Sequence, residues 1–117
     1  DKFRQVPVYK VRELVENNAC IIDVREQDEF EKGHLINAVN IPMSQFRERL
    51  SEIPTDVPVY LHCRSSQRSY NDICALQKLG YTNVYNISGS YLGISFYEYY
   101  RDKAEGRKPI VTEYNFA

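Results

Sequence analysis

The thiol of Cys63 is the most reactive side chain that the sequence offers, and it lies between an apolar run and a short polar stretch. The apolar run ends at Leu61-His62, and the polar stretch reads Cys63-Arg64-Ser65-Ser66-Gln67-Arg68-Ser69. A helical pattern then begins. Backbone N–H groups of such a turn can surround a sulfur atom, and the helix that follows directs its positive end toward the same point. Both effects favour negative charge at this position.

The residues after Cys63 add to this effect. A free thiol has a pKa near about 8.5, and a helix N-terminus or neighbouring arginines lower such a value by about one to several units. Because Arg64 and Arg68 follow within five positions, we expect Cys63 to be ionised and nucleophilic. The competing interpretation is a small buried cysteine that ends a strand, which is a common fate of a lone cysteine.

Hydrophobic patterning predicts the elements that must position this cysteine. Short runs rich in branched residues predict buried strands at 19–24, 57–61 and 84–87. Amphipathic spacing predicts helices over 9–17, from Ser44 through Ile53, and from about Gln67 to Leu79, where Gly80 suits the position after a helix. Alternating strands and helices predict an α/β fold with a parallel sheet and helices on both faces. Ligands of such sheets bind at the carboxyl ends of the strands, so the chemistry is expected in those loops.

Length and composition fit one folded domain. The 117 residues predict a single domain, 1–117, with a core at about 6–104 and an extended tail at 105–117. The start at Asp1 and a single methionine, Met43, indicate a piece excised from a longer chain. The 15 basic and 16 acidic residues are spread along the chain, which argues against nucleic-acid binding. The sequence has neither an apolar run of the ~20 residues that cross a bilayer nor a signal peptide, so a cytoplasmic location without membrane association is expected.

The three cysteines have no C-x-x-C spacing, which argues against a disulfide framework and against a zinc site. Cys20 lies in an apolar strand and is expected in the core. Cys74 follows Arg68 by six residues, a helical rise of about 9 Å, which exceeds the ~7 Å that a disulfide spans between Cα atoms. Neither is expected to act as a resolving thiol for Cys63.

Several motifs in order resemble the signature of the rhodanese family. They are Asp23-Val24-Arg25, Glu29-Phe30, Gly33-His34-Leu35 and Ala38-Val39-Asn40-Ile41-Pro42. With the Cys63 loop and Gly89, the resemblance covers roughly residues 6 to 100. It implies a five-stranded parallel sheet flanked by helices, and a sulfurtransferase whose active cysteine, Cys63, carries sulfur as a persulfide.

The same resemblance implies a reaction. The Cys63 thiolate would attack the outer sulfur of thiosulfate, a polysulfide or a low-molecular-weight persulfide, and a thiol or cyanide would then accept that sulfur. The loop would bind the anionic donor and hold the persulfide through Arg64, Ser65, Ser66, Gln67, Arg68 and Ser69. No cofactor and no metal ion are expected in this domain.

A narrower similarity concerns the surroundings of the domain. The way the chain opens and its ending at 105–109 are similar to rhodanese domains attached behind flavin-dependent reductases, including coenzyme A disulfide and persulfide reductases. This similarity implies a fused flavoprotein partner upstream that would hold FAD and NAD(P)H.

Two other functions stay open. Some rhodanese-like domains are non-catalytic interaction modules, although these usually lack the loop cysteine. Cysteine phosphatases with related folds use a C-x5-R loop, and His62 before Cys63 matches the beginning of that loop. Here, however, only four residues separate Cys63 from Arg68, and a tighter loop suits a sulfur atom better than a phosphoryl group.

Other polar and aromatic groups are interpreted as structural. The signature residues Asp23, Arg25 and Glu29 are expected to form an ion pair that fastens the loop after the first buried strand. His34 is expected in a hydrogen-bonded turn, and the aromatic cluster at 96–100 is expected to pack on the sheet. Family members often have other residues at positions 90 and 94, so Ser90 and Ile94 are expected to alter the rim of the donor pocket.

Overall fold

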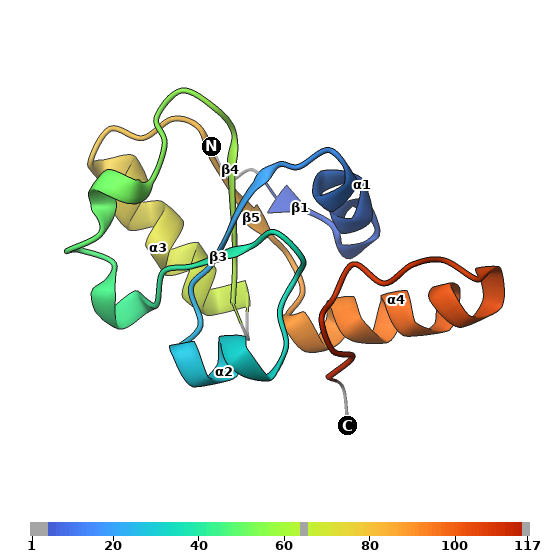
Figure 1. The fold of residues 1–117 in the computed structure, drawn as a ribbon. Coiled ribbons are helices and arrows are strands. Elements are labelled where there is room, and N and C mark those ends of the chain that lie inside the picture. Colours follow the sequence, from blue (N-terminus) through green and yellow to red (C-terminus); the bar gives the residue numbers. More distant parts are fainter. Residues whose placement is uncertain (1–4, 64–65, 116–117) are drawn as a thin grey trace.

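The computed structural model describes residues 5–63 and 66–115, and its centre is one parallel sheet (Figure 1). The strand order is β1-β5-β4-β2-β3, and all four pairings are parallel. The strands are β1 (Gln5–Val6), β2 (Cys20–Asp23), β3 (Val39–Asn40), β4 (Val59–His62) and β5 (Val84–Ile87). β4 is therefore the central strand, and the predicted five-stranded parallel α/β fold is confirmed.

Helices cover both faces of this sheet, as predicted (Figure 1). One apolar cluster lies between the sheet, α3 and the segment before β4, and the other lies between the sheet, α1, α4 and the C-terminal segment. The helical elements are η1 (Val8–Lys10), α1 (Val11–Glu16), α2 (Gln27–Lys32), η2 (Met43–Gln45), η3 (Leu50–Glu52), α3 (Ser66–Lys78) and α4 (Tyr91–Glu105). Branched residues alternate between the two clusters along β2, with Ile21 in one and Ile22 in the other, because successive side chains of a strand point to opposite faces.

The segment between β3 and β4 differs from its prediction. Instead of one helix that begins at Ser44, the chain forms the two short 3-10 turns η2 and η3, and the Ser44 hydroxyl donates to Glu26 rather than capping a helix. The backbone leaves the helical region at Arg49, with φ −112° and ψ 19°. The apolar residues at positions 46 and 53 still reach the core, so their spacing was satisfied without a continuous helix.

The C-terminal segment is part of the core. α4 ends at Gly106, whose left-handed φ of 66° lets the chain turn back toward the sheet. Ile110 and Val111 are then buried in the second apolar cluster, and Leu35 pairs with Val111 in an antiparallel bridge. The core thus extends beyond the boundary near residue 104 that the sequence predicts.

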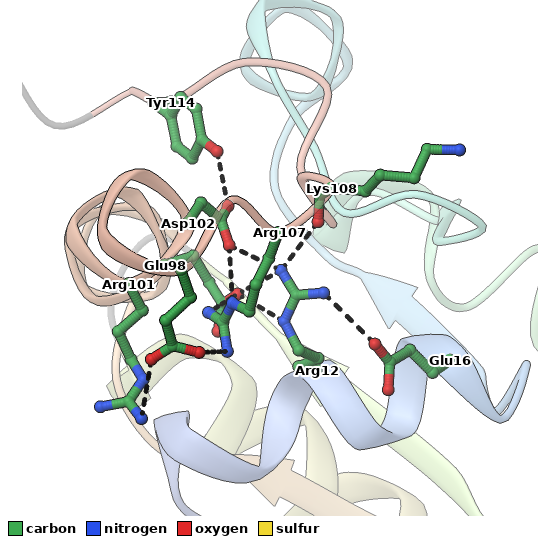
Figure 2. A network of polar contacts seen from close by, with 9 residues as sticks. Arg12, Glu16, Glu98, Arg101, Asp102, Arg107, Lys108 and Tyr114 are labelled. Atoms are coloured by element: carbon green, nitrogen blue, oxygen red, sulfur yellow. Dashed lines mark hydrogen bonds and ion pairs between the residues drawn. The ribbon is translucent and has the colours of Figure 1, made fainter.

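A network of charged side chains ties α1, α4 and this C-terminal segment together (Figure 2). Arg12 donates to Glu98 at 3.0 Å, to Asp102 at 2.8 Å and to the Lys108 carbonyl at 2.9 Å. Arg107 donates to the same two carboxylates, each at 3.0 Å. Because both carboxylates are buried on α4, the two guanidinium groups neutralise charges that would otherwise be costly to bury.

The aromatic cluster on α4 was predicted to pack on the sheet, and this prediction is wrong for two of its members. Phe96 is 55% exposed and Tyr100 is 57% exposed, whereas Glu98 between them is buried. The buried face of α4 is instead formed by Tyr91, Ile94, Ser95, Glu98 and Asp102.

Candidate active site

Cys63 lies at the carboxyl end of the central strand, as the sequence predicts. β4 ends at His62, Cys63 follows it, and α3 begins at Ser66, so only three residues separate the strand from the helix. The Cys63 side chain is buried in the apolar cluster beneath α3, together with Val24 and Ile73. The cysteine is therefore placed by the most deeply enclosed strand of the sheet and sits beside the amino-terminal end of a 13-residue helix.

The predicted donor-binding loop is described only in part. Arg64 and Ser65 lie outside the described residues. Ser66, Gln67, Arg68 and Ser69 form the first turn of α3, one residue earlier than the predicted helix start, and their side chains lie outside the described part of the chain. The helix dipole of α3 therefore begins three residues after Cys63, where it favours an anion.

A buried ion pair supports the neighbouring strand end, which confirms the prediction for Asp23 and Arg25. Arg25 Nε donates to Asp23 Oδ1 at 2.9 Å, and Arg25 Nη2 donates to Asp23 Oδ2 at 2.7 Å. Asp23 is 0% exposed and Arg25 is 3% exposed. Arg25 Nη2 also donates to the Gly33 carbonyl at 2.7 Å, so the pair fastens the turn after β2 to the turn after α2.

His62, the residue directly before Cys63, lies beside this ion pair. β2 and β4 place Asp23 opposite His62, and the Val24 amide donates to the His62 carbonyl at 3.0 Å. The His62 ring is fully buried, with Nε2 3.5 Å from Asp23 Oδ2. Burial lowers the pKa of His62 and outweighs the opposite effect of the Asp23 carboxylate, so the ring is neutral at physiological pH.

Tyr91 connects the ion pair to the C-terminal segment. The Arg25 guanidinium lies 4.4 Å from the centroid of the Tyr91 ring, a cation–π distance, and the Tyr91 hydroxyl donates to the Glu113 carbonyl at 2.7 Å. A Cβ atom at Gly33 would lie 3.0 Å from the Tyr91 hydroxyl oxygen, which explains why glycine precedes His34. The contact of Tyr91 with the ion pair was not predicted from the sequence, in which the glycine at position 33 was the one available signal.

His34 and Glu29 have structural contacts. His34 Nδ1 lies 2.7 Å from the Phe30 carbonyl and its ring stacks on Phe30, which confirms the predicted turn. Glu29 Oε1 accepts a hydrogen bond from the Glu26 amide and completes a capping box at the start of α2.

The residues at positions 90 and 94 differ in their surroundings. Ser90 caps α4, since its hydroxyl oxygen accepts from the Gly93 amide at 3.1 Å. Ile94 is fully buried in the second apolar cluster, so the prediction that it shapes the rim of a pocket is wrong.

All three cysteines are thiols. Cys20 is partly buried and packs against the first apolar cluster, and burial raises the pKa of its thiol. Within residues 5–63 and 66–115, no group of three or more His, Cys, Asp or Glu side chains could hold a metal ion. Over the same described residues, no helix combines the length and apolar character needed to cross a membrane.

The fold and the place of Cys63 define the class, which is an α/β domain with a cysteine at the carboxyl end of the central parallel strand. The family model described as Rhodanese-like domain matches residues 8–95, so the chain belongs to this family.

Relatives and a solved structure agree with this membership. The chain is 51% identical over 73 residues to Uncharacterized protein YqhL of Bacillus subtilis, a match that covers 62% of this chain and 58% of that protein. It is 36% identical over 72 residues to a protein of Allochromatium vinosum named Sulfurtransferase, covering 62% of this chain and 67% of that one. The crystal structure of reduced Bacillus anthracis CoADR-RHD superimposes with a TM-score of 0.77 at 31% identity, covering 85% of this chain and 18% of that chain.

Proposed function

We propose that this domain is a sulfurtransferase that carries sulfane sulfur as a persulfide on Cys63. The observation that carries the proposal is the placement of Cys63 at the end of β4, three residues before α3, in a domain of the rhodanese-like family. The name Sulfurtransferase of the Allochromatium relative supports sulfur transfer as the reaction class.

The proposed reaction has two displacement steps. With thiosulfate as donor, the Cys63 thiolate attacks the outer sulfur, the S–S bond of thiosulfate breaks, and sulfite leaves with the electron pair. Cys63 then carries a persulfide anion. A thiolate acceptor attacks the outer sulfur of this persulfide, takes it as a new persulfide, and regenerates the Cys63 thiolate. With cyanide as acceptor the product is thiocyanate.

The described residues supply position rather than proton transfer. The Asp23–Arg25 pair and the backbone hydrogen bond from Val24 to His62 fix the strand end that carries Cys63. Because His62 is buried and neutral, we assign it to this support and not to general acid–base catalysis. The polar residues 64–69 are proposed to attract the anionic donor and to hold the terminal sulfur.

The direct test is the intact mass of the domain after incubation with thiosulfate or with a polysulfide. Persulfidation of one cysteine adds about 32 Da. We expect one such adduct, which reducing agent removes, and we expect it to vanish in Cys63→Ser. Matched controls are Cys20→Ser and Cys74→Ser, which should keep the adduct.

The outcomes separate the functions that the sequence leaves open. If folded wild-type protein forms no adduct with any sulfane donor, the sulfur-transfer proposal fails, and a non-catalytic interaction module explains the domain better. Hydrolysis of an aryl phosphate that depends on Cys63 would instead favour a phosphatase. We expect no such hydrolysis.

We also propose that the domain works next to a flavin-dependent reductase in a longer chain. The chain covers only 18% of the CoADR-RHD chain to which it is similar, so in that protein the matching part is one unit of a larger whole. FAD and NAD(P)H would then be bound outside this domain. Sequencing the reading frame upstream of Asp1 tests the proposal, since a strand–GxGxxG–helix pattern is expected there and its absence would contradict a fused flavoprotein.

A further inference from the structure

An apolar groove lies on the surface between the last turns of α3 and the segment η2–η3. Its volume is about 480 Å³, within the range of ligand and peptide pockets. The lining residues are Met43, Phe46, Arg47, Leu50, Ala75, Leu76, Lys78 and Leu79. Phe46 and Leu76 form a buried floor, whereas Leu79 is 62% exposed at the edge.

The charged side chains that line this groove are positive. Among the described residues, Arg47 and Lys78 are the only charged ones that line it, and both are exposed. Neither forms an ion pair with another residue of the described part of the chain. Arg49, two residues further along, behaves differently, since its guanidinium pairs with Glu52 at 2.8 Å. The groove therefore offers an apolar floor and two cations that are available to an external anion.

A second copy of this chain matches the groove poorly. On α4, the domain presents a group of exposed apolar residues at Leu92, Phe96 and Tyr100. That group is flanked by the basic residues Arg101 and Lys103. Arg101 pairs with Glu105 at 3.5 Å, so Lys103 is the residue that would approach Arg47 and Lys78 as a like charge. Like charges across an interface disfavour association.

We propose that this groove docks an amphipathic helix of a protein partner, with apolar side chains in the groove and acidic side chains at Arg47 and Lys78. Helix-in-groove recognition uses apolar residues at i, i+3 or i+4, and i+7, which suits an apolar floor with a charged rim. Truncating an exposed leucine at the edge of such a groove weakens binding only when the partner covers it. Truncation of Leu79 therefore tests whether a partner helix occupies the groove.

The experiment selects binders from a displayed library of helical 14-residue peptides, with apolar residues fixed at positions 3, 6, 7 and 10 and all other positions randomised. The bait is the full 117-residue chain under reducing conditions. We expect the selected peptides to be enriched in Asp and Glu. Amide chemical-shift changes in the ¹⁵N-labelled chain should then map to the groove residues around Phe46 and Leu76.

Charge reversal at the rim tests the electrostatic part. Arg47→Glu combined with Lys78→Glu should weaken binding of the selected peptides by about tenfold or more. Arg101→Glu combined with Lys103→Glu changes the net charge equally on another surface and should leave the affinity within about twofold. Leu79→Ala should weaken binding without changing the thermal unfolding temperature, since this side chain is largely exposed.

Four results would overturn the proposal. The first is a selection that yields no binder, or binders without an acidic excess, and the second is a set of shift changes that maps away from the groove. The third is self-association of the chain in sedimentation velocity that the rim reversal abolishes, since the occupant would then be a second copy. The fourth is binding to phosphatidylglycerol vesicles that perturbs the same amides and displaces the peptides.

Discussion

Replacing Asp23 by asparagine removes one charge from the buried pair beneath the candidate active site. The side chain keeps its size, but Arg25 loses its counterion while it remains 3% exposed. Breaking one partner of a buried ion pair costs about 3 to 5 kcal/mol, because the remaining charge stays desolvated. A domain of this size is stable by about 5 to 15 kcal/mol, so Asp23→Asn should remove a large part of the total.

Urea unfolding, followed by far-UV circular dichroism, measures this loss. With a denaturant slope of about 1 to 3 kcal/mol per M, the midpoint should fall by about 2 M. If Asp23→Asn is already unfolded without urea, the double variant Asp23→Asn/Arg25→Met still decides the matter. Removing both charges leaves no unpaired charge in the core, so the double variant should recover at least half of the lost stability.

The matched control is an exposed pair on α4. Arg101 and Glu105 lie 3.5 Å apart with both side chains 49% exposed, so Glu105→Gln should leave the urea midpoint almost unchanged. Equal effects of Asp23→Asn and Glu105→Gln would refute a buried, mutually dependent ion pair, and so would a double variant less stable than Asp23→Asn alone.

Three further predictions concern the packing and ionisation around the site. Gly33→Ala should lower the free energy of unfolding by about 1 to 3 kcal/mol in urea titrations, because its Cβ would come within 3.0 Å of the Tyr91 hydroxyl oxygen. Burial and the Asp102 carboxylate raise the pKa of Tyr114 to about 12. The protonated Tyr114 hydroxyl therefore stabilises the fold fully below the unfolded-state pKa near about 10, and this stabilisation declines as the pH rises toward 12. Tyr114→Phe should flatten this decline in thermal melts. The pKa of His62 is lowered by burial, so the unfolded chain binds a proton more readily and stability should fall as the pH drops below about 6.5. His62→Gln should weaken this dependence in thermal melts.

The parts of the fold that the sequence predicts well are those with a direct physical signal. Branched apolar runs predict β4 and β5 to within two residues, because strands covered on both faces require them. The polar stretch after His62 correctly places Cys63 at a strand end before a helix.

The parts that the sequence does not predict depend on tertiary contacts. Helical spacing of Phe46, Leu50 and Ile53 is satisfied by two 3-10 turns, since the core requires only that these side chains point inward. The core contribution of Ile110 and Val111 carries no periodicity, because a single pair of apolar residues in a polar segment has none. The support of the Asp23–Arg25 pair by Tyr91 arises only when α4 is folded against the sheet.

The central claim is that Cys63 carries sulfur between a donor and an acceptor. Thiosulfate labelled with ³⁵S at its outer sulfur tests this claim in a single turnover, followed by peptide mapping without reducing agent. We predict that the label is found on the peptide that contains Cys63 and that it leaves with a low-molecular-weight thiol when that thiol is added. Label on Cys20 or Cys74 instead, or label on Cys63 that no acceptor removes, would contradict the account.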